Sequence, residues 1–341
     1  MIIMRPVELK DVPALMALAE KTGSGLTSLP ADEDALRARV ARARRAWRHA
    51  VPRSEQGFVF VLENTEDGHV PGISAIEAAV GLTEPWHHYR VDSVSHTSEA
   101  LNIHNVQQTL RLCQEQAGSS EICTLFLAPE WRRAGNGYLL SRARFLFIAA
   151  FPDIFDGRIV AQMRGVSDDR GYSPFWNGVG RHFFPVDFTQ ADNLSASGQK
   201  NVIAQLMPRY PIYSAFLPAD ARAAIGQVHP HTAPARAMLE KEGFRFGGYI
   251  DIFDGGPMLG CSVRDIYSVR NSQLKTVRAG RLPEGKWPLY LVANERWQDF
   301  RAILAHAKID ENHATLAASN LQALLCQPGE RVRLIPLNIP T

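Results

Sequence analysis

Short apolar runs alternate with longer segments of mixed polarity along this 341-residue chain. Residues 58–62 and 72–76 are apolar runs separated by the turn-forming residues 64–68, a pattern that predicts an antiparallel hairpin. Nearer the N-terminus, two isoleucines at positions 2 and 3 predict a strand, and Asp11 can open the amphipathic helix that follows. Strands and helices therefore alternate, and we expect an α/β fold built on a mixed sheet.

The middle of the chain repeats this alternation of strand and helix. Residues 125–127 form another strongly apolar strand, which leads through Pro129 and a glycine-bearing turn into a long helix that ends before Pro152. Residues 158–163 return as a strand. Ser173 followed by proline is typical of a helix start, because serine caps the first turn and proline suits its first position.

Two segments of the second half resemble each other. Residues 173–183 and 233–244 each contain a proline-opened helix, a glycine and a following aromatic residue, with Gly180 and Gly243 at the expected left-handed cap. Endings of this kind are also common in unrelated helices. The pattern therefore permits a duplicated unit without requiring one.

The chain length favours two packed units, since a single hydrophobic core seldom grows beyond 250 to roughly 300 residues. We place the boundary near residue 190 and expect an N-terminal domain of residues 1–190 and a second domain of residues 191–341. Beyond Cys261 the pattern becomes strand-rich. The expected C-terminal strands are residues 289–292, 300–304 and 331–336.

Composition narrows the function classes. Hydrophobic residues at 45% and charged residues at 21% are ordinary for a globular protein, and a formal charge of +2 is too balanced for a nucleic-acid binder. One basic cluster surrounds Leu36, Val40 and Trp47, which predicts the solvated face of an amphipathic helix. The basic residues of this cluster are Arg37, Arg39, Arg42, Arg44, Arg45 and Arg48.

Cysteine spacing and hydropathy indicate a cytoplasmic protein that does not enter a membrane. The four cysteines are far apart and form no C-x-x-C pair, which is typical of isolated thiols in a reducing compartment. Residues 1–10 lack the apolar core of a signal peptide. The apolar run of residues 145–151 is far shorter than a membrane span.

The most informative motif is R-x-x-G-x-G, formed by Arg132, Gly135 and Gly137 between the strand of residues 125–127 and the long helix. Glycine lets the backbone turn its N–H groups toward a ligand, and a helix N-terminus favours a pyrophosphate. The motif lacks the Lys-Ser/Thr of a P-loop and the glycine spacing of a dinucleotide fold. A tight turn without a ligand is the alternative interpretation.

The strand, proline, R-x-x-G-x-G and helix resemble the acyl-CoA signature of the GCN5-related N-acetyltransferase superfamily. Five further segments resemble the arginine N-succinyltransferase family across nearly the whole chain. They are residues 22–30 (TGSGLTSLP), 54–57 (SEQG), 173–176 (SPFW), 226–230 (GQVHP) and 249–257 (YIDIFDGGP).

This resemblance implies a tandem acyl-CoA N-acyltransferase (GNAT-like) fold with a strand-rich C-terminal extension. It also implies transfer of succinyl from succinyl-CoA to the α-amino group of L-arginine, in arginine catabolism. Succinyl-CoA is then a co-substrate, and neither a tightly bound cofactor nor a metal is expected. Related subunits accept ornithine, and a non-catalytic acyl-CoA or amino-acid sensor is the alternative from another class. The sequence is also compatible with a homo-oligomer.

The resemblance extends to the acyl-CoA site. It implies that Leu125 contacts acyl-CoA, and we include Phe126 and Leu127 because free main-chain N–H groups of a splayed strand can polarise a thioester. Arg132 can pair with a phosphate. The alternatives are core packing for the Leu125 side chain and a surface role for Arg132.

For the transfer step, the family assigns the histidine that corresponds to His229 as the proton donor. Taken without the family, His229 reads as a structural strand-end residue. His231 lies two residues further on, but no third metal ligand is evident. An arginine substrate needs carboxylates for its guanidinium, and Asp251 and Asp254 are the candidates. Turn formation is the alternative for Asp254, and orientation of His229 is the alternative for Asp251.

Overall fold

The computed structural model describes residues 1–22, 26–133, 135–168, 170–196, 205–282 and 287–338. Part of the glycine-containing segment 22–30 therefore lies outside the described residues, as does the alanine of the R-x-x-G-x-G loop.

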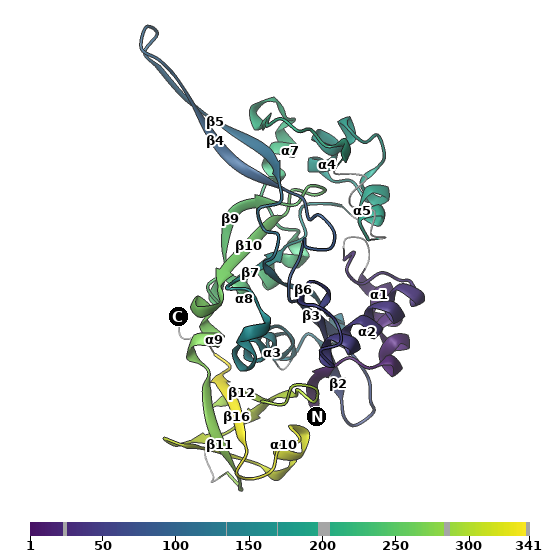
Figure 1. Cartoon of the computed structure of the whole chain (residues 1–341), viewed down its shortest axis with the longest axis vertical. Helices are drawn as coiled ribbons and strands as arrows, with labels where there is room; N and C mark the ends of the chain where they lie inside the picture. The colour runs from purple at the N-terminus through teal and green to yellow at the C-terminus, as the bar shows by residue number, and fades with distance from the viewer. Residues whose placement is uncertain (23–25, 134, 169, 197–204, 283–286, 339–341) are drawn as a thin grey trace.

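One 16-stranded mixed sheet runs the length of the molecule (Figure 1). Its order is β14-β15-β11-β16-β12-β13-β1-β2-β3-β6-β7-β10-β9-β4-β5-β8. The strands are β1 (Ile2–Pro6), β2 (Gly57–Asn64), β3 (Gly72–Glu77), β4 (His88–Ser98), β5 (Ile103–Cys113), β6 (Ser120–Leu127), β7 (Arg158–Gln162), β8 (Ile212–Tyr213), β9 (Arg245–Ile250), β10 (Pro257–Ser262), β11 (Gln273–Ala279), β12 (Leu289–Asn294), β13 (Ala302–His306), β14 (Lys308–Ile309), β15 (His313–Leu316) and β16 (Arg331–Pro336).

Helices cover both faces of the N-terminal strands. The α-helices are α1 (Val12–Thr22), α2 (Glu33–Trp47), α3 (Asn136–Ala150), α4 (Pro174–Gly178), α5 (Phe188–Ala196), α7 (Ala219–Ala224), α8 (Ala233–Lys241), α9 (Tyr267–Asn271) and α10 (Ala318–Ala323). Alternate residues of β2 point to opposite faces. Val59 and Val61 therefore pack with α1 and α2, whereas Phe58 and Phe60 pack in the core that contains α3.

The strands expected from the apolar runs are present. The predicted hairpin is confirmed, because β2 and β3 pair antiparallel with Phe58 opposite Ile76. At the C-terminal end, β12 and β16 form where strands were expected, and β13 begins at Ala302. The pair Ile3–Ile303 joins these strands to the N-terminal sheet. Because the sheet is continuous, the division near residue 190 stays a prediction about folding units.

The arginine-rich helix is α2, and its apolar residues Leu36, Val40 and Trp47 are buried as expected. Its arginines are not all solvated, however. Arg42 pairs with Glu77 at 2.7 Å, and Arg39 donates to a threonine of β6. The prediction of a solvated face was therefore wrong for these arginines, which fasten α2 to the sheet.

One of the two expected glycine caps is wrong. Gly243 follows α8 with a φ of 105°, as a left-handed cap requires. The proline-opened helix α4 ends at Gly178, and Gly180 instead begins the 3-10 turn Gly180–His182 without a positive φ. A Cβ at Gly180 would lie 2.2 Å from the Trp176 ring, so close packing explains this glycine.

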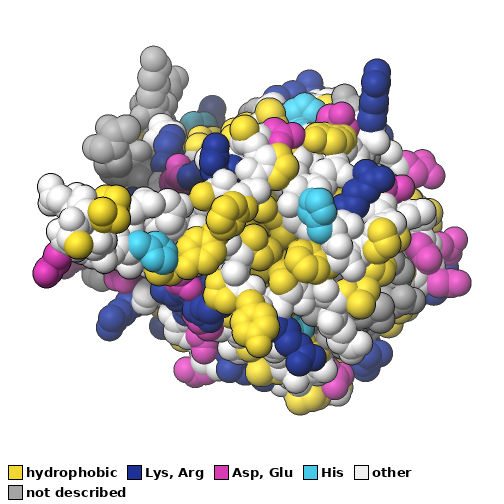
Figure 2. All heavy atoms as spheres, turned by 90° about the horizontal axis from the view of Figure 1, so that it is seen from above, with side chains coloured by type: hydrophobic (Ala, Val, Ile, Leu, Met, Phe, Trp, Pro, Cys, Tyr) yellow, Lys and Arg dark blue, Asp and Glu magenta, His cyan; other side chains and the backbone are white. Residues whose placement is uncertain are grey.

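A long hairpin of β4 and β5 projects from one end of the molecule (Figure 1). Hydrophobic side chains gather beside it on the face seen in Figure 2. Exposed apolar residues of the hairpin and of the segment after β8 include Leu101, Ile103, Val106 and Phe216. The homo-oligomer stays a prediction. Among the described helices, none has the length and apolar character needed to cross a membrane.

A buried ion pair ties α3 to the second half of the chain. The Arg142 and Glu242 side chains are each only 1% exposed, and Arg142 Nε donates to Glu242 Oε1 at 2.7 Å. Glu242 also accepts from the main-chain N–H and the hydroxyl of Ser268. The helix that follows the R-x-x-G-x-G loop is thus anchored from the far side of the core.

Candidate active site

The candidate site lies where β6 and β7 part. One edge of β6 pairs with β3, from Glu121 opposite Glu77 to Leu127 opposite Gly72. The other edge pairs with β7, in parallel, at Ser120 and Glu121. Further along, that edge has no strand partner within the described parts of the chain. Main-chain groups at such an edge need other partners, and a ligand can supply them.

A β-bulge reshapes β6 next to this point. The register with β3 shifts between Ile73 and Ala75, and Thr124 has a φ of 52°, which is uncommon for a β-branched residue. The Thr124 hydroxyl accepts from Arg39 Nη2 at 2.7 Å. Bulges re-aim the residues beside them, here Leu125. This bulge was not predicted, because its only signal in the sequence is a polar threonine inside an apolar run.

The side chains that follow the bulge belong to the core. Leu125 and Leu127 pack against the cluster that contains α3, whereas Phe126 packs against the cluster under α1 and α2. These contacts support the expected core packing of the Leu125 side chain. The main chain of these residues could contact acyl-CoA without disturbing this packing.

The R-x-x-G-x-G loop joins β6 to α3. Arg132 is exposed, and its Nε donates to the Leu127 carbonyl oxygen at 3.0 Å, which holds the loop against the strand end. Gly135 is the residue before α3 and has a φ of 82°, a conformation that favours glycine. Gly137 lies in the first helical turn, and a Cβ there would have no neighbour within 4 Å in the described part of the chain. This open space adjoins the first turn of α3, whose N–H groups have no intrahelical acceptor, although the Asn136 N–H donates to the Arg133 carbonyl oxygen at 3.0 Å.

The space beside Gly137 provides a clean test of the loop. We expect Gly137→Val to raise the Kd for CoA about tenfold or more, because the new side chain would occupy the place proposed for the pyrophosphate. Calorimetric titration with CoA measures this. Gly157→Val is the matched control, since Gly157 also has open space around its Cβ position. Unchanged CoA affinity in a folded Gly137→Val protein would remove the loop from the site.

Gly135→Val is a less selective variant. A Cβ at Gly135 would lie 2.7 Å from Leu304 Cδ1, and the positive φ would add strain. Loss of CoA binding in that variant could therefore arise either from a changed loop conformation or from direct obstruction of the ligand.

His229 lies just beyond the end of β7. It is buried, and its main-chain N–H donates to the Arg164 carbonyl oxygen at 2.9 Å. Its Nδ1 accepts from the main-chain N–H of His231 at 3.2 Å. A main-chain N–H can only donate, so this hydrogen bond assigns the proton of the neutral ring to Nε2. The ring thus presents Nε2–H as its donor.

Asp251 is buried in the turn between β9 and β10. Its Oδ1 accepts from the main-chain N–H groups of Phe253 and Asp254, at 2.7 and 3.0 Å. Its Oδ2 accepts from the side-chain amide of Gln162, the last residue of β7. These bonds connect the turn to the strand beside the site.

Asp254 closes the same turn. Its Oδ2 accepts from the Gly165 N–H at 2.6 Å and its Oδ1 from the Gly256 N–H at 2.8 Å. Burial, and then the charge of Asp251, raises the pKa of Asp254 well above its ordinary value. These contacts fit the turn role expected as the alternative for Asp254. The role of either aspartate in guanidinium binding stays a prediction.

The structure brings the expected site residues to two neighbouring strand ends. Parallel strands end at the same edge of a sheet, so the segments that follow β6 and β7 lie on the two sides of the parting. The β6 side carries Leu125, Phe126, Leu127, Arg132, Gly135 and Gly137. The β7 side carries His229, Asp251 and Asp254.

The pair of histidines does not extend to a metal cluster in the described residues. The rings of His229 and His231 have centroids 4.9 Å apart. No group of three or more His, Cys, Asp or Glu side chains suited to a metal occurs among those residues.

Two models of one known family together match almost the whole chain. A model of the arginine N-succinyltransferase beta subunit matches residues 2–268, and a model of the C-terminal domain of that subunit matches residues 273–336. The first match ends within α9, and the second begins at the first residue of β11.

Individual relatives agree with the family models. The chain is 55% identical to the arginine N-succinyltransferase of Shigella boydii serotype 18 over 337 residues, which cover 99% of this chain and 98% of the relative. It is 54% identical to the enzyme of the same name from Citrobacter koseri, with the same coverage.

A solved structure shows the same fold. The arginine/ornithine succinyltransferase subunit AI from Pseudomonas aeruginosa superposes with a TM-score of 0.91 at 35% identity, over 99% of each chain. The expected mixed α/β acyltransferase fold is thereby confirmed. By family model, sequence and structure alike, the chain belongs to the arginine N-succinyltransferase family.

Proposed function

We propose that this protein transfers a succinyl group from succinyl-CoA to the α-amino group of L-arginine, giving N2-succinylarginine and CoA. The observation that carries the proposal is the family membership along the whole chain. The separation of β6 from β7 supports this proposal, because the free edge of β6 and the segment that carries His229 both lie near this end of the two strands.

Different segments of the site would bind different parts of succinyl-CoA. The pantetheine arm would lie along the open edge of β6, where main-chain N–H groups near Leu125 can polarise the thioester carbonyl. The pyrophosphate would lie at the start of α3, beside Gly137. The α-amino nitrogen then attacks the carbonyl carbon, the C–S bond breaks, and CoA leaves as a thiolate.

His229 would supply the proton that the thiolate needs. Its Nδ1 already accepts from the His231 N–H, so the proton of the neutral ring resides on Nε2. Histidine is the side chain best suited to exchange a proton near neutral pH. The incoming α-amino group has a pKa of roughly 8 and must lose a proton to react. For one ring to serve both needs, Nδ1 must release the His231 N–H and take the amine proton as Nε2 gives its proton to the thiolate, so that the ring stays neutral.

Two other functions remain as alternatives. The Pseudomonas relative is described as an arginine/ornithine succinyltransferase, so ornithine is a second candidate acceptor. A non-catalytic sensor would bind succinyl-CoA and an amino acid without turnover. Release of thiol in proportion to the acceptor separates an enzyme from a sensor.

A donor and acceptor screen tests the proposal. Succinyl-CoA and acetyl-CoA are each combined with arginine, ornithine and lysine, and thiol release is followed. We expect succinyl-CoA with arginine to give the highest kcat/KM. A tenfold or greater preference for acetyl-CoA would overturn the succinyl assignment, and a preference for ornithine would change the acceptor. Binding of both substrates without thiol release would favour the sensor.

A further inference from the structure

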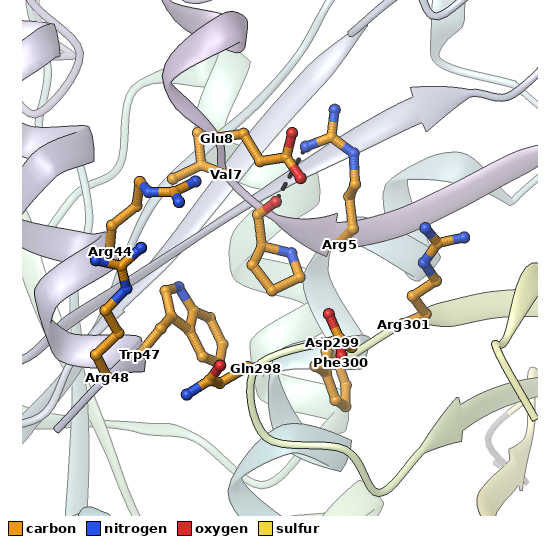
Figure 3. A pocket seen from close by; sticks show the side chains of 11 residues that line it. Arg5, Val7, Glu8, Arg44, Trp47, Arg48, Gln298, Asp299, Phe300 and Arg301 are labelled. Atoms are coloured by element: carbon orange, nitrogen blue, oxygen red, sulfur yellow. Dashed lines mark hydrogen bonds between the residues drawn. The ribbon is translucent and has the colours of Figure 1, made fainter.

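A pocket lies away from the candidate active site (Figure 3). It has a volume of about 220 Å³ and forms where the end of β1, the last turn of α2 and the loop before β13 meet. The last residue of β1, Pro6, pairs with Phe60, so β1 ends toward the start of β2. The last residue of β6 lies opposite Gly72 of β3, and Gly72 in turn lies opposite Leu62, toward the end of β2. The pocket and the R-x-x-G-x-G loop are therefore at opposite ends of these strands.

Positive charge dominates the lining of this pocket. Arg44 and Arg48 project from the same side of α2, one turn apart, and Arg301 comes from the opposite wall. Like charges at this helical spacing repel each other. Among the described residues, neither Arg44 nor Arg48 takes part in an ion pair.

The other charged groups in the lining offset only part of this charge. Arg5 is already held by Asp11 at 2.8 and 2.9 Å and also by Glu63. Glu8 pairs with Lys10 at 2.8 Å. Apart from these paired groups, the lining contains one acidic side chain, Asp299, and three arginines. An additional anion would balance the excess positive charge.

A buried hydrogen-bond donor without an acceptor also indicates that an anion can bind in this pocket. The Trp47 side chain lines the pocket, the residue is only 4% exposed, and its indole Nε1–H has no hydrogen-bond partner among the residues that the structure describes. Figure 3 shows this nitrogen on the ring edge that faces the pocket. Leaving a buried donor unsatisfied is unfavourable, whereas a bound anion would accept from it.

We propose that this pocket binds a small anion with carboxylate or phosphate groups. Arg44, Arg48 and Arg301 surround its oxygens, and the Trp47 indole N–H donates to one of them. Guanidinium groups suit both kinds of oxyanion, because two parallel N–H groups match two oxygens. The site is separate from acyl transfer and does not depend on the identity of the transferred group.

Calorimetric titration tests this proposal with two probes, inorganic phosphate and succinate. CoA and N2-succinylarginine, the proposed products, are present at saturation, so that the transfer site is occupied. We expect one probe or both to bind at a single site, with the stronger probe identifying the preferred oxyanion. Arg44→Gln should weaken binding about tenfold, and the double variant Arg44→Gln with Arg48→Gln should abolish it. Trp47→Phe, which keeps a ring but removes the donor, should weaken binding about tenfold.

Arg45→Gln is the matched control, because Arg45 lies on the same helix, is exposed and does not line the pocket. It should leave probe binding unchanged. Thiol release should be unchanged in Arg44→Gln measured without either probe, which separates this proposal from the proposed function. If neither probe binds up to about 10 mM, the proposal is wrong. Binding that is equally strong in the double variant would contradict it as well.

Discussion

Replacement of His229 by alanine is expected to lower kcat about 10²- to 10⁴-fold while the KM for each substrate changes little. This loss corresponds to roughly 2.7 to 5.4 kcal/mol of activation free energy, the range typical of a positioned acid–base group. The physical reason is that the ring holds a proton on Nε2 next to the place where the thiolate is proposed to leave.

His231→Ala is the control for this variant. His231 is exposed, and the bond that orients His229 comes from its main chain, which alanine retains. We therefore expect His231→Ala to keep most of the activity. If chemistry limits the rate, the kcat–pH profile of His229→Ala should also lose one limb. A folded His229→Ala protein with more than about a third of the wild-type kcat would exclude the proton-transfer role.

Loss of the Glu242 charge is expected to lower the free energy of unfolding by about 3–5 kcal/mol. In Glu242→Gln the shape is kept, but the buried Arg142 guanidinium loses its counter-charge while 1% exposed. Because Arg142 lies on α3, the change should also loosen the helix that begins at the R-x-x-G-x-G loop. Denaturant titration of the variant and the wild type measures the difference.

Two comparisons make this result specific. Arg142→Met combined with Glu242→Gln removes both charges and should restore part of the lost stability, because no unpaired charge remains. Glu33→Gln breaks an exposed pair with Arg37 and should cost no more than about 0.5 kcal/mol. A loss below about 1 kcal/mol in Glu242→Gln would mean that the buried pair is not an anchor for α3.

Features specified by local pattern were predictable from the sequence. The β2–β3 hairpin follows from apolar runs around a turn, and the helix cap at Ser173 is present as expected, with its hydroxyl accepting from the Trp176 N–H. The R-x-x-G-x-G loop was placed correctly between strand and helix for the same reason. Each of these depends on residues close together in the chain.

Features that depend on distant contacts were missed. The β4–β5 hairpin carries many polar side chains exposed on both faces, so it lacks the alternation that marks a strand. The bulge at Thr124 is stabilised by Arg39, which is 85 positions away. Arg142 and Arg144 are buried although arginine usually indicates a surface.

The candidate site likewise combines features that the local sequence predicts with contacts that it does not. His229 was proposed from its family context and its role stays a prediction, whereas its hydrogen bonds to Arg164 and His231 were not visible in the pattern. The pairing of Asp251 with Gln162 likewise depends on where β7 ends relative to the β9–β10 turn. These contacts decide whether an aspartate is available to a substrate, and composition carries no information about them.

Identification of the acylated product tests the central claim most directly. The purified protein is incubated with succinyl-CoA and L-arginine, and the product is examined by mass spectrometry and NMR. We predict one succinyl group on the α-amino nitrogen, formed in equal amount with free CoA. Succinyl on the guanidinium, or CoA released without any acylated arginine, would contradict the account.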